Sequence, residues 1–357
     1  MNKVSFEEKN TLHSLAPYVG KIRQDLVHKL IMEYAVPEKY IYDPFCGSGT
    51  VLLEGWAKGY NVIGSDVSEY AYLLSKAKLN PHTDVNEIEA TLEVYNKNVN
   101  QILENGQNTN PPSWICSFFH PETLKEITSW VKVLSEARDW HFLASLLGIL
   151  HHQRPGYLSY PSSNSTPYLR DKKYPLAEYP EMYEYKNVYE RLRKKILRTI
   201  KCIPSFDEKL DRRVLKRDSS SIRPLDNVGT IITSPPYMKA LSYARDNRMR
   251  LWFLGIEDWN GLDKVISPSK DIFLRTMKTS VDMWSNMQKK GDRCIVIVGD
   301  MVLSKSVGTK LSDYVVSLAN SKYKLLDEYY DPIPESKKVI KGNSFLLGEK
   351  IIAMERK

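Results

Sequence analysis

The chain has 357 residues, 42% of them hydrophobic and 26% charged, and a formal net charge of +8. This composition is ordinary for a globular enzyme, and no run of about 18 apolar residues could span a bilayer. The N-terminus has no apolar segment behind a basic start, so we expect a cytoplasmic location and no membrane partner. Four distant cysteines without a CxxC pair predict neither a disulfide framework nor a metal site. The positive charge favours a polyanionic partner.

Apolar strands alternate with amphipathic helices along the first part of the chain, which predicts an α/β fold. A helical pattern leads to a short buried strand with a glycine turn, and a second helix, strand and helix follow. In order, these predicted elements cover residues 26–34, 39–45, 50–59, 60–66 and 68–80. The result is a β-α-β-α series with tight loops.

Between residues 81 and 209 the pattern changes. Helical stretches at 86–104 and 122–150 precede an irregular segment that contains several prolines. The region ends in a strongly basic helix, YERLRKKILRTIK, which is either a solvated face or a contact for a polyanion. We interpret residues 81–209 as a largely helical insertion.

Strand patterns resume after the insertion. Three segments, RRVLKRD, VGTIITSPPY and RCIVIVGD, are predicted to be strands. The last two runs, LLDEYYDPIP and KIIAMER, are expected to pair as a terminal antiparallel hairpin.

The motif DPFCGSGT, residues 43–50, lies where the first strand turns into a helix. Gly47 and Gly49 allow the backbone to approach a ligand closely, and the helix that follows directs free N–H groups toward it. A dinucleotide site is an alternative, but Leu52 stands where GxGxxG has its third glycine. Asp66 ends the next strand, where a carboxylate can accept both hydroxyls of a ribose, so a nucleoside cofactor is indicated.

The motif TSPPY follows the apolar strand GTII and is expected at the carboxyl edge of the sheet, the usual ligand edge of an open α/β fold. Pro235 and Pro236 hold a stiff, extended backbone with fixed carbonyl directions. Ser234 adds an acceptor and Tyr237 a flat aromatic face. Together they can accept two hydrogen bonds from an amino group and stack on its ring. In isolation, a purely structural Pro-Pro turn is the alternative.

DPFCGSGT, Asp66 and TSPPY together resemble the motifs of the amino-methylating DNA methyltransferases of the SPPY type. The resemblance implies a Rossmann-like, S-adenosylmethionine-dependent methyltransferase sheet, mostly parallel with an antiparallel last strand. The catalytic domain would then be split into residues 1–80 and 210–357. The helical insertion, residues 81–209, is the expected target-recognition region.

The resemblance also implies roles for individual residues. The expected catalytic residues are Ser234, Pro235, Pro236 and Tyr237. The expected contacts to S-adenosylmethionine are Tyr18, Asp43, Phe45, Gly47, Gly49, Thr50, Asp66 and Asp218. The segment after SPPY resembles a helix of the family and adds Tyr243 and Arg245 as expected contacts to DNA. The charge of the basic helix, rather than the resemblance, predicts the other contacts to DNA: Arg191, Arg193, Lys194, Lys195 and Arg198.

Ser234 is the first residue of SPPY, which in this family is associated mainly with cytosine N4, whereas DPPY and NPPY go with adenine N6. We therefore expect methylation of cytosine N4 in duplex DNA through a flipped base, in a restriction-modification system with a separate endonuclease. Adenine N6, an RNA base and a non-catalytic nucleic-acid-binding role are the alternatives. Methylation of C5 is disfavoured because that chemistry needs a cysteine nucleophile, usually in a Pro-Cys pair, and no such pair occurs.

Overall fold

The structure is a computed structural model that describes residues 10–106, 110–153, 156–163, 166–236, 242–267, 269–299, 310–332 and 348–357. The chain forms two compact units. The sheet unit contains Val19–Ser75, Ser205–Tyr243 and Gly261–Lys357, and the helical unit contains Met1–Tyr18, Lys76–Pro204 and Ala244–Asn260. The expected insertion lies mostly in the helical unit, which also takes in the N-terminal segment and residues 244–260.

Seven strands form one sheet in the order β3-β2-β1-β4-β5-β7-β6. Strands β1 to β5 pair in parallel, while β7 runs antiparallel to its neighbours β5 and β6. The predicted mostly parallel sheet with an antiparallel last strand is confirmed, as is the terminal hairpin. The strands are β1 (Tyr40–Asp43), β2 (Val62–Asp66), β3 (Arg212–Lys216), β4 (Val228–Thr233), β5 (Arg293–Gly299), β6 (Tyr323–Pro332) and β7 (Gly348–Arg356).

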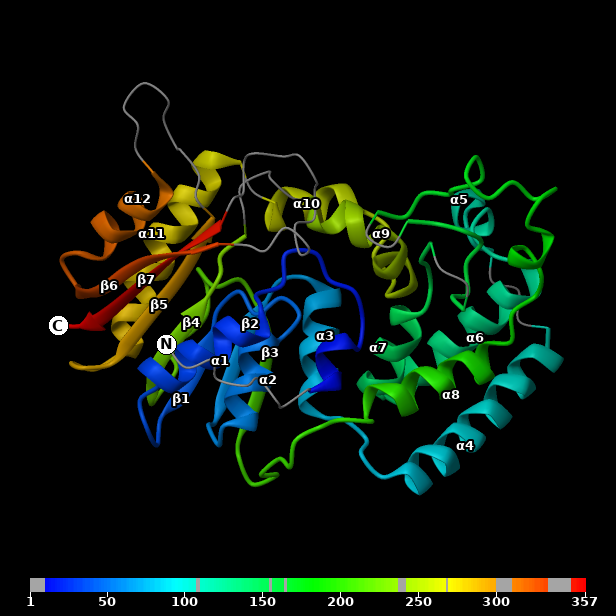
Figure 1. The fold of residues 1–357 in the computed structure, drawn as a ribbon, viewed down its shortest axis with the longest axis horizontal. Helices are drawn as coiled ribbons and strands as arrows, with labels where there is room; N and C mark the ends of the chain where they lie inside the picture. The colour runs from blue at the N-terminus through cyan, green and yellow to red at the C-terminus, as the bar shows by residue number, and fades with distance from the viewer. Residues whose placement is uncertain are drawn as a thin grey trace. The chain divides into compact units, whose positions relative to one another are not determined.

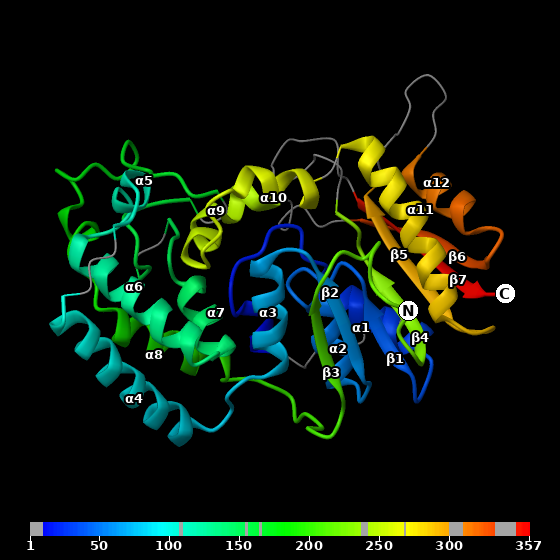
Figure 2. The same ribbon diagram turned by 180° about the vertical axis from the view of Figure 1, so that it is seen from behind.

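Helices cover both faces of the sheet (Figures 1 and 2). On one face, α2 packs so closely on β1 and β2 that a Cβ on Gly55 would lie 2.8 Å from the Val62 side chain. On the other face, α11 and α12 share one core with alternate residues of the central strands, including Tyr42 and Ile231. The helices named here are α1 (Gln24–Tyr34), α2 (Thr50–Ala57), α3 (Glu69–Leu79), α11 (Lys270–Met287) and α12 (Leu311–Ala319).

The helical unit corrects one expectation, because the predicted helical stretch 122–150 is two helices. Arg138 has a φ of +54°, which interrupts the right-handed helix. Asp139 then caps the next helix by accepting the N–H of Phe142 at 3.0 Å. The helices wholly or mostly in this unit are α4 (Val85–Glu104), α5 (Ser113–Cys116), α6 (Pro121–Glu136), α7 (Trp140–Gly148), α8 (Val188–Thr199) and α9 (Tyr243–Phe253), with short 3-10 helices at Thr11–Ser14 and Pro180–Met182. Most of α10 (Trp259–Ile266) belongs to the sheet unit.

Two segments distant in the sequence are anchored in this unit by buried hydrogen bonds. Thr11 Oγ1 donates to the carbonyl of Thr199 at the end of α8, at 2.7 Å. Arg250 of α9 donates from Nε to the carbonyl of Leu147 in the last turn of α7, at 3.1 Å. These bonds satisfy carbonyl groups that a helix end leaves without an internal partner. Across the described ranges, none of the helices has the length and apolar character needed to cross a membrane.

Candidate active site

The expected site residues of the sheet unit follow four adjacent parallel strands. Asp66 and Asp43 end β2 and β1, while Ser234 and Asp218 come just after β4 and β3. Because parallel strands end at the same edge, the order β3-β2-β1-β4 brings these residues to one edge of the sheet. The edge therefore joins segments from both parts of the split sequence.

The glycine turn between β1 and α2 is held against α3. Gly47 and Gly49 have φ values of +48° and +72°, in the left-handed region that favours glycine. Ser75 of α3 donates from Oγ to the carbonyl of Gly47 at 3.2 Å. A Cβ on Gly49 would lie 2.7 Å from Ser75 Oγ and 3.0 Å from its Cα. Sequence reasoning missed Ser75, whose only signal is a small polar residue inside an apolar helical pattern.

The helix α2 begins at Thr50, and its N-cap residue, Gly49, forms no side-chain capping bond. The first N–H groups of α2 are therefore not capped by a side chain and can donate to an anionic ligand group. Thr50 itself is buried, with its hydroxyl 3.4 Å from that of Ser48. We therefore assign Thr50 to the internal packing of the turn.

Asp66 ties the glycine turn to β2. Its Oδ2 accepts the N–H of Gly47 and its Oδ1 the N–H of Ser68, both at 2.9 Å. Burial raises the pKa of Asp66 to about 6, and these backbone hydrogen bonds oppose the increase. The side chain is only partly buried, and each carboxylate oxygen can accept a second hydrogen bond. Asp66 can thus hold the turn and a ligand hydroxyl together.

Asp43 connects the glycine turn to the strand that carries SPPY. Its Oδ1 accepts the hydroxyl of Thr233 at 2.7 Å and the N–H of Phe45 at 3.1 Å. Burial raises the pKa of Asp43 to about 7, the hydrogen bonds from Thr233 and Phe45 oppose the increase, and the nearby Asp66 adds to it. Since Asp43 is only 1% exposed, most of its hydrogen-bonding capacity serves the protein.

Residues of the SPPY motif follow Thr233 directly. Pro235 is buried, while Ser234 and Pro236 are half-buried. Tyr237 lies outside the described residues. Phe45, also half-buried, meets the buried Trp284 of α11 edge-on, with ring centroids 6.4 Å apart. Trp284 was not expected near the cofactor motif, because α11 was not among the predicted helices.

Asp218 stabilises the turn that follows β3. Its Oδ1 accepts both the N–H and the hydroxyl of Ser220, at 2.7 and 2.6 Å. The carboxylate is half-buried, so part of its surface can meet a ligand. Among the described residues, no three His, Cys, Asp or Glu side chains gather in an arrangement that could hold a metal ion.

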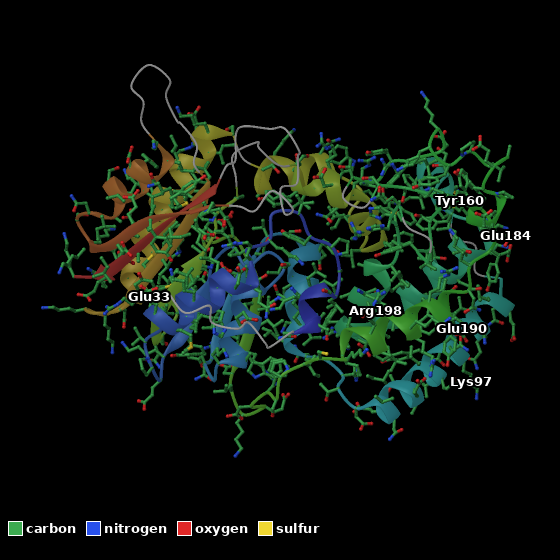
Figure 3. The ribbon with its side chains drawn as sticks, in the orientation of Figure 1. Glu33, Lys97, Tyr160, Glu184, Glu190 and Arg198 are labelled. Atoms are coloured by element: carbon green, nitrogen blue, oxygen red, sulfur yellow. The ribbon has the colours of Figure 1, made fainter. Side chains whose placement is uncertain are left out.

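The cations predicted on α8 differ in their surroundings. Lys195 is 6% exposed and donates to the carbonyl of Ser14 at 2.7 Å. Arg193 pairs with Glu89, with its Nε at 2.7 Å. Their charged groups therefore already have partners inside the helical unit. The other predicted contacts are Arg191, which is half-buried, Lys194 and Arg198, which are exposed (Arg198 is labelled in Figure 3), Tyr243, which is buried, and Arg245, which is exposed.

Tyr18 is half-buried and is the last residue of the first segment of the helical unit. Of the described residues that precede it, Thr11 and Ser14 accept or donate hydrogen bonds with residues of α8, and Leu15 lies against α7. A Cβ on Gly148 of α7 would lie 2.5 Å from the carbonyl oxygen of Leu15. The expected contact of Tyr18 with a cofactor stays a prediction.

Comparison with known proteins identifies a family for part of the chain. Residues 2–77 match a family described as DNA methylase. The Type II methyltransferase M.MjaII of Methanocaldococcus jannaschii is 33% identical over 86 residues, which make up 24% of this chain and 16% of the relative. M.MvaI of Kocuria varians is 51% identical over 43 residues, 12% of this chain and 10% of the relative. The chain thus spans only a small part of these relatives' lengths.

Among solved structures, TrmN from Thermus thermophilus aligns with 97% of this chain and 52% of the TrmN chain, at 11% identity and a TM-score of 0.39.

The family match covers the glycine turn and Asp66 and ends before TSPPY. It confirms the resemblance noted for these residues in the sequence.

The turn geometry predicts an asymmetry between two glycines with positive φ. Gly49→Ala should lower the free energy of unfolding by about 3 kcal/mol, because left-handed strain and overpacking against Ser75 add together. Gly59→Ala is the matched control, since Gly59 has a φ of +84° and nothing within 4 Å of the added Cβ. It should cost only about 1 kcal/mol. If urea unfolding showed the same loss of unfolding free energy for both variants, the packing described for Gly49 would be contradicted.

The buried carboxylate of Asp43 predicts a pH-dependent stability. Between the ordinary aspartate pKa of 3.8 and about 7, the folded state binds more protons at Asp43 than the unfolded state, so the free energy of unfolding falls as the pH rises. Asp43→Asn cannot titrate but keeps an acceptor for Thr233. Relative to wild type, this variant should therefore become more stable between about pH 5 and about pH 8. Urea unfolding at both pH values measures the difference in free energy of unfolding between Asp43→Asn and wild type. The exposed Asp226→Asn is the control. A difference that does not change with pH would argue against burial of the Asp43 charge.

Proposed function

We propose that the chain, whose residues 2–77 match the DNA methylase family, transfers a methyl group from S-adenosylmethionine to cytosine N4 in duplex DNA. The observation that carries the proposal is the hydrogen bond between Thr233 and Asp43. It joins the glycine turn of a nucleoside-cofactor motif to the strand that ends in SPPY. A cofactor site and an amino-group site are thereby built on neighbouring strands.

The residues at the sheet edge fit S-adenosylmethionine in chemistry. When bound, S-adenosylmethionine supplies a methyl group activated by a positively charged sulfonium. Asp43 and Asp66 provide negative charge beside the turn, where a cation lowers the cost of burying carboxylates. Asp66 is the partner for the ribose hydroxyls, and the N–H groups at the start of α2 suit the carboxylate of the methionine part. The half-buried ring of Phe45 can stabilise the cation if its face is turned toward it.

The SPPY residues account for activation of the amino group. An exocyclic amine is a weak nucleophile because its lone pair is delocalised into the ring. In the proposed mechanism, the Ser234 side chain and the Pro235 carbonyl accept its two hydrogens and favour a pyramidal nitrogen. The stiffness of the Pro-Pro backbone keeps these acceptors fixed, so little reorganisation is needed. Tyr237 stacks on the base in this proposal.

The proposed substrate is a base that leaves the duplex, because the amino group is inaccessible inside the stack. Extrusion costs a few kcal/mol, which protein contacts to the base and the DNA backbone offset. The helical unit supplies the backbone contacts. A modification role beside a separate restriction endonuclease is supported by the names of the two Type II methyltransferase relatives.

The product of the reaction tests this proposal. DNA from cells that express the protein should contain N4-methylcytosine, measured by digestion to nucleosides and mass spectrometry. Ser234→Ala and Tyr237→Ala should each reduce the signal by about 100-fold or more, because each removes a group that positions the amine. Ser221→Ala is the matched control, since Ser221 is exposed and lies after β3.

The other outcomes of that experiment have defined meanings. N6-methyladenine would keep the fold and the cofactor but overturn the inference drawn from Ser234. A methylated base found only in RNA would overturn the DNA substrate. Absence of any new methylated base, with DNA binding retained, would support a non-catalytic nucleic-acid-binding protein.

The hydrogen bonds of Asp66 predict the cofactor affinity and its pH dependence. Asp66→Ala should weaken binding of S-adenosylmethionine by about 100-fold, since two charge-assisted hydrogen bonds are lost. Wild-type affinity should also fall as the pH drops below about 6, where protonation of Asp66 removes its charge. Isothermal titration at about pH 8 and about pH 5 measures both effects. The exposed Asp226→Ala should bind like wild type, and an unchanged affinity in Asp66→Ala would exclude the proposed ribose contact.

A further inference from the structure

One surface of the helical unit concentrates positive charge outside α8. It is formed by the first half of α9 and by residues 166–173, which lie in the irregular region between α7 and α8 (Figure 1). We call it the α9 cationic surface. Its members are Arg170, Lys172, Lys173, Arg245 and Arg248.

Hydrogen bonds fix the two parts of this surface to each other. Arg248 of α9 donates from Nη2 to the carbonyl of Pro167. Thr166 donates from its hydroxyl to Asp246 Oδ1 at 3.3 Å, and Asp246 lies two residues before Arg248 on α9. The start of α9 and residues 166–167 therefore form one structural element.

The lysines of the surface stand on an ordered turn. The N–H of Arg170 donates to the carbonyl of Pro161 at 2.8 Å, next to an antiparallel bridge between Ser162 and Leu169. The N–H groups of Lys173 and Tyr174 both donate to the carbonyl of Arg170 at 3.0 Å. This turn presents Lys172 and Lys173 to solvent on a defined backbone, which lowers the entropy cost of binding.

The charges of the surface lack partners of opposite sign. Apart from Arg245, which lies 3.5 Å from Asp246, no member of the surface forms an ion pair with a described carboxylate. Burial lowers the pKa of Arg248, the nearby Arg245 lowers it further, and the charge of Asp246 opposes the decrease. Asp171 accepts the N–H of Lys172 instead of pairing with a cation. Such a cluster is stabilised by binding a polyanion.

Cations of both elements have internal partners: on the α9 cationic surface, Arg170 donates to the side-chain oxygen of Gln153, and Arg248 donates to the carbonyls of Pro167 and Arg245. On α8 the charged groups of Arg193 and Lys195 are used by Glu89 and by the carbonyl of Ser14. On the α9 cationic surface, aromatic side chains accompany the cations. Tyr168 is 51% exposed, and Lys173 lies over the Tyr174 ring at 5.4 Å. Arginine, lysine and tyrosine side chains are the groups that commonly contact nucleic-acid phosphates.

We infer that the α9 cationic surface binds the phosphodiester backbone of the DNA substrate, independently of the exposed cations Lys194 and Arg198 of α8. The inference rests on the proposed function for the identity of the polyanion. Its position in the chain supports it, because α9 begins seven residues after Pro236. A backbone contact at Arg245 is thus encoded immediately beyond the motif that handles the target base.

Salt dependence of DNA binding separates the two surfaces. For Lys172→Gln/Lys173→Gln, the slope of log affinity against log salt should decrease by about 1.8, since about 0.9 is lost for each phosphate contact. Affinity for a fluorescent duplex at about 0.1 M salt should fall by about 10-fold to 100-fold. Lys194→Gln/Arg198→Gln removes two exposed cations from α8 and measures the contribution of that helix separately. Lys97→Gln/Lys290→Gln removes the same charge from exposed positions outside both surfaces and controls for net charge.

The outcomes distinguish this inference from the proposed function. Each double variant is first titrated with S-adenosylmethionine, and wild-type cofactor affinity shows that the sheet unit is intact; the circular dichroism spectrum checks the helical unit. If the α8 pair lowers the slope and the α9-surface pair does not, the inference is wrong while DNA binding stands. An equal effect of all three pairs would also overturn it, since net charge alone would then decide. If wild-type protein binds structured RNA but not duplex DNA, the proposed function and the inference fail together.

Discussion

The hydrogen bond from Thr233 to Asp43 holds together parts of the site that are 190 residues apart in the sequence. It is possible only because β1 and β4 are neighbours in the sheet and run parallel, so that both strands end at the same edge. The same carboxylate also accepts the N–H of Phe45 and so determines where the glycine turn begins. Any change in the register of β1 against β4 would separate the glycine turn from SPPY.

This arrangement places two carboxylates where burial opposes their ionisation. Burial raises the pKa of both Asp43 and Asp66, and the charge of Asp66 raises that of Asp43 further. In the absence of a cation, the edge of the sheet therefore carries an electrostatic cost. A positively charged cofactor would reduce that cost, so the raised pKa values of the two carboxylates and their attraction for a sulfonium would have the same physical origin.

The sequence predicted the parallel strands, the glycine turn and the position of SPPY after β4, because apolar runs and proline or glycine signals are local properties. It could not predict Ser75 or Trp284. Both act through contacts with residues far away in the chain, and neither belongs to a local motif. The break between α6 and α7 was missed for a related reason, since Arg138 adopts a positive φ without being glycine.

The internal partners of charged side chains could not be predicted from the sequence either, because these partners are also distant in the chain. The basic helix α8 is evident in the sequence, but the sequence does not show that Glu89 and the Ser14 carbonyl already occupy two of its cations. Conversely, Arg248 and Lys173 are far apart in the chain and gain a common role only when α9 binds residues 166–167. A cation is available to a polyanion only if the fold leaves it accessible and without an internal partner. Recognition surfaces must therefore be identified from the partners of each charge, and the number of charges in a helix is a poor substitute.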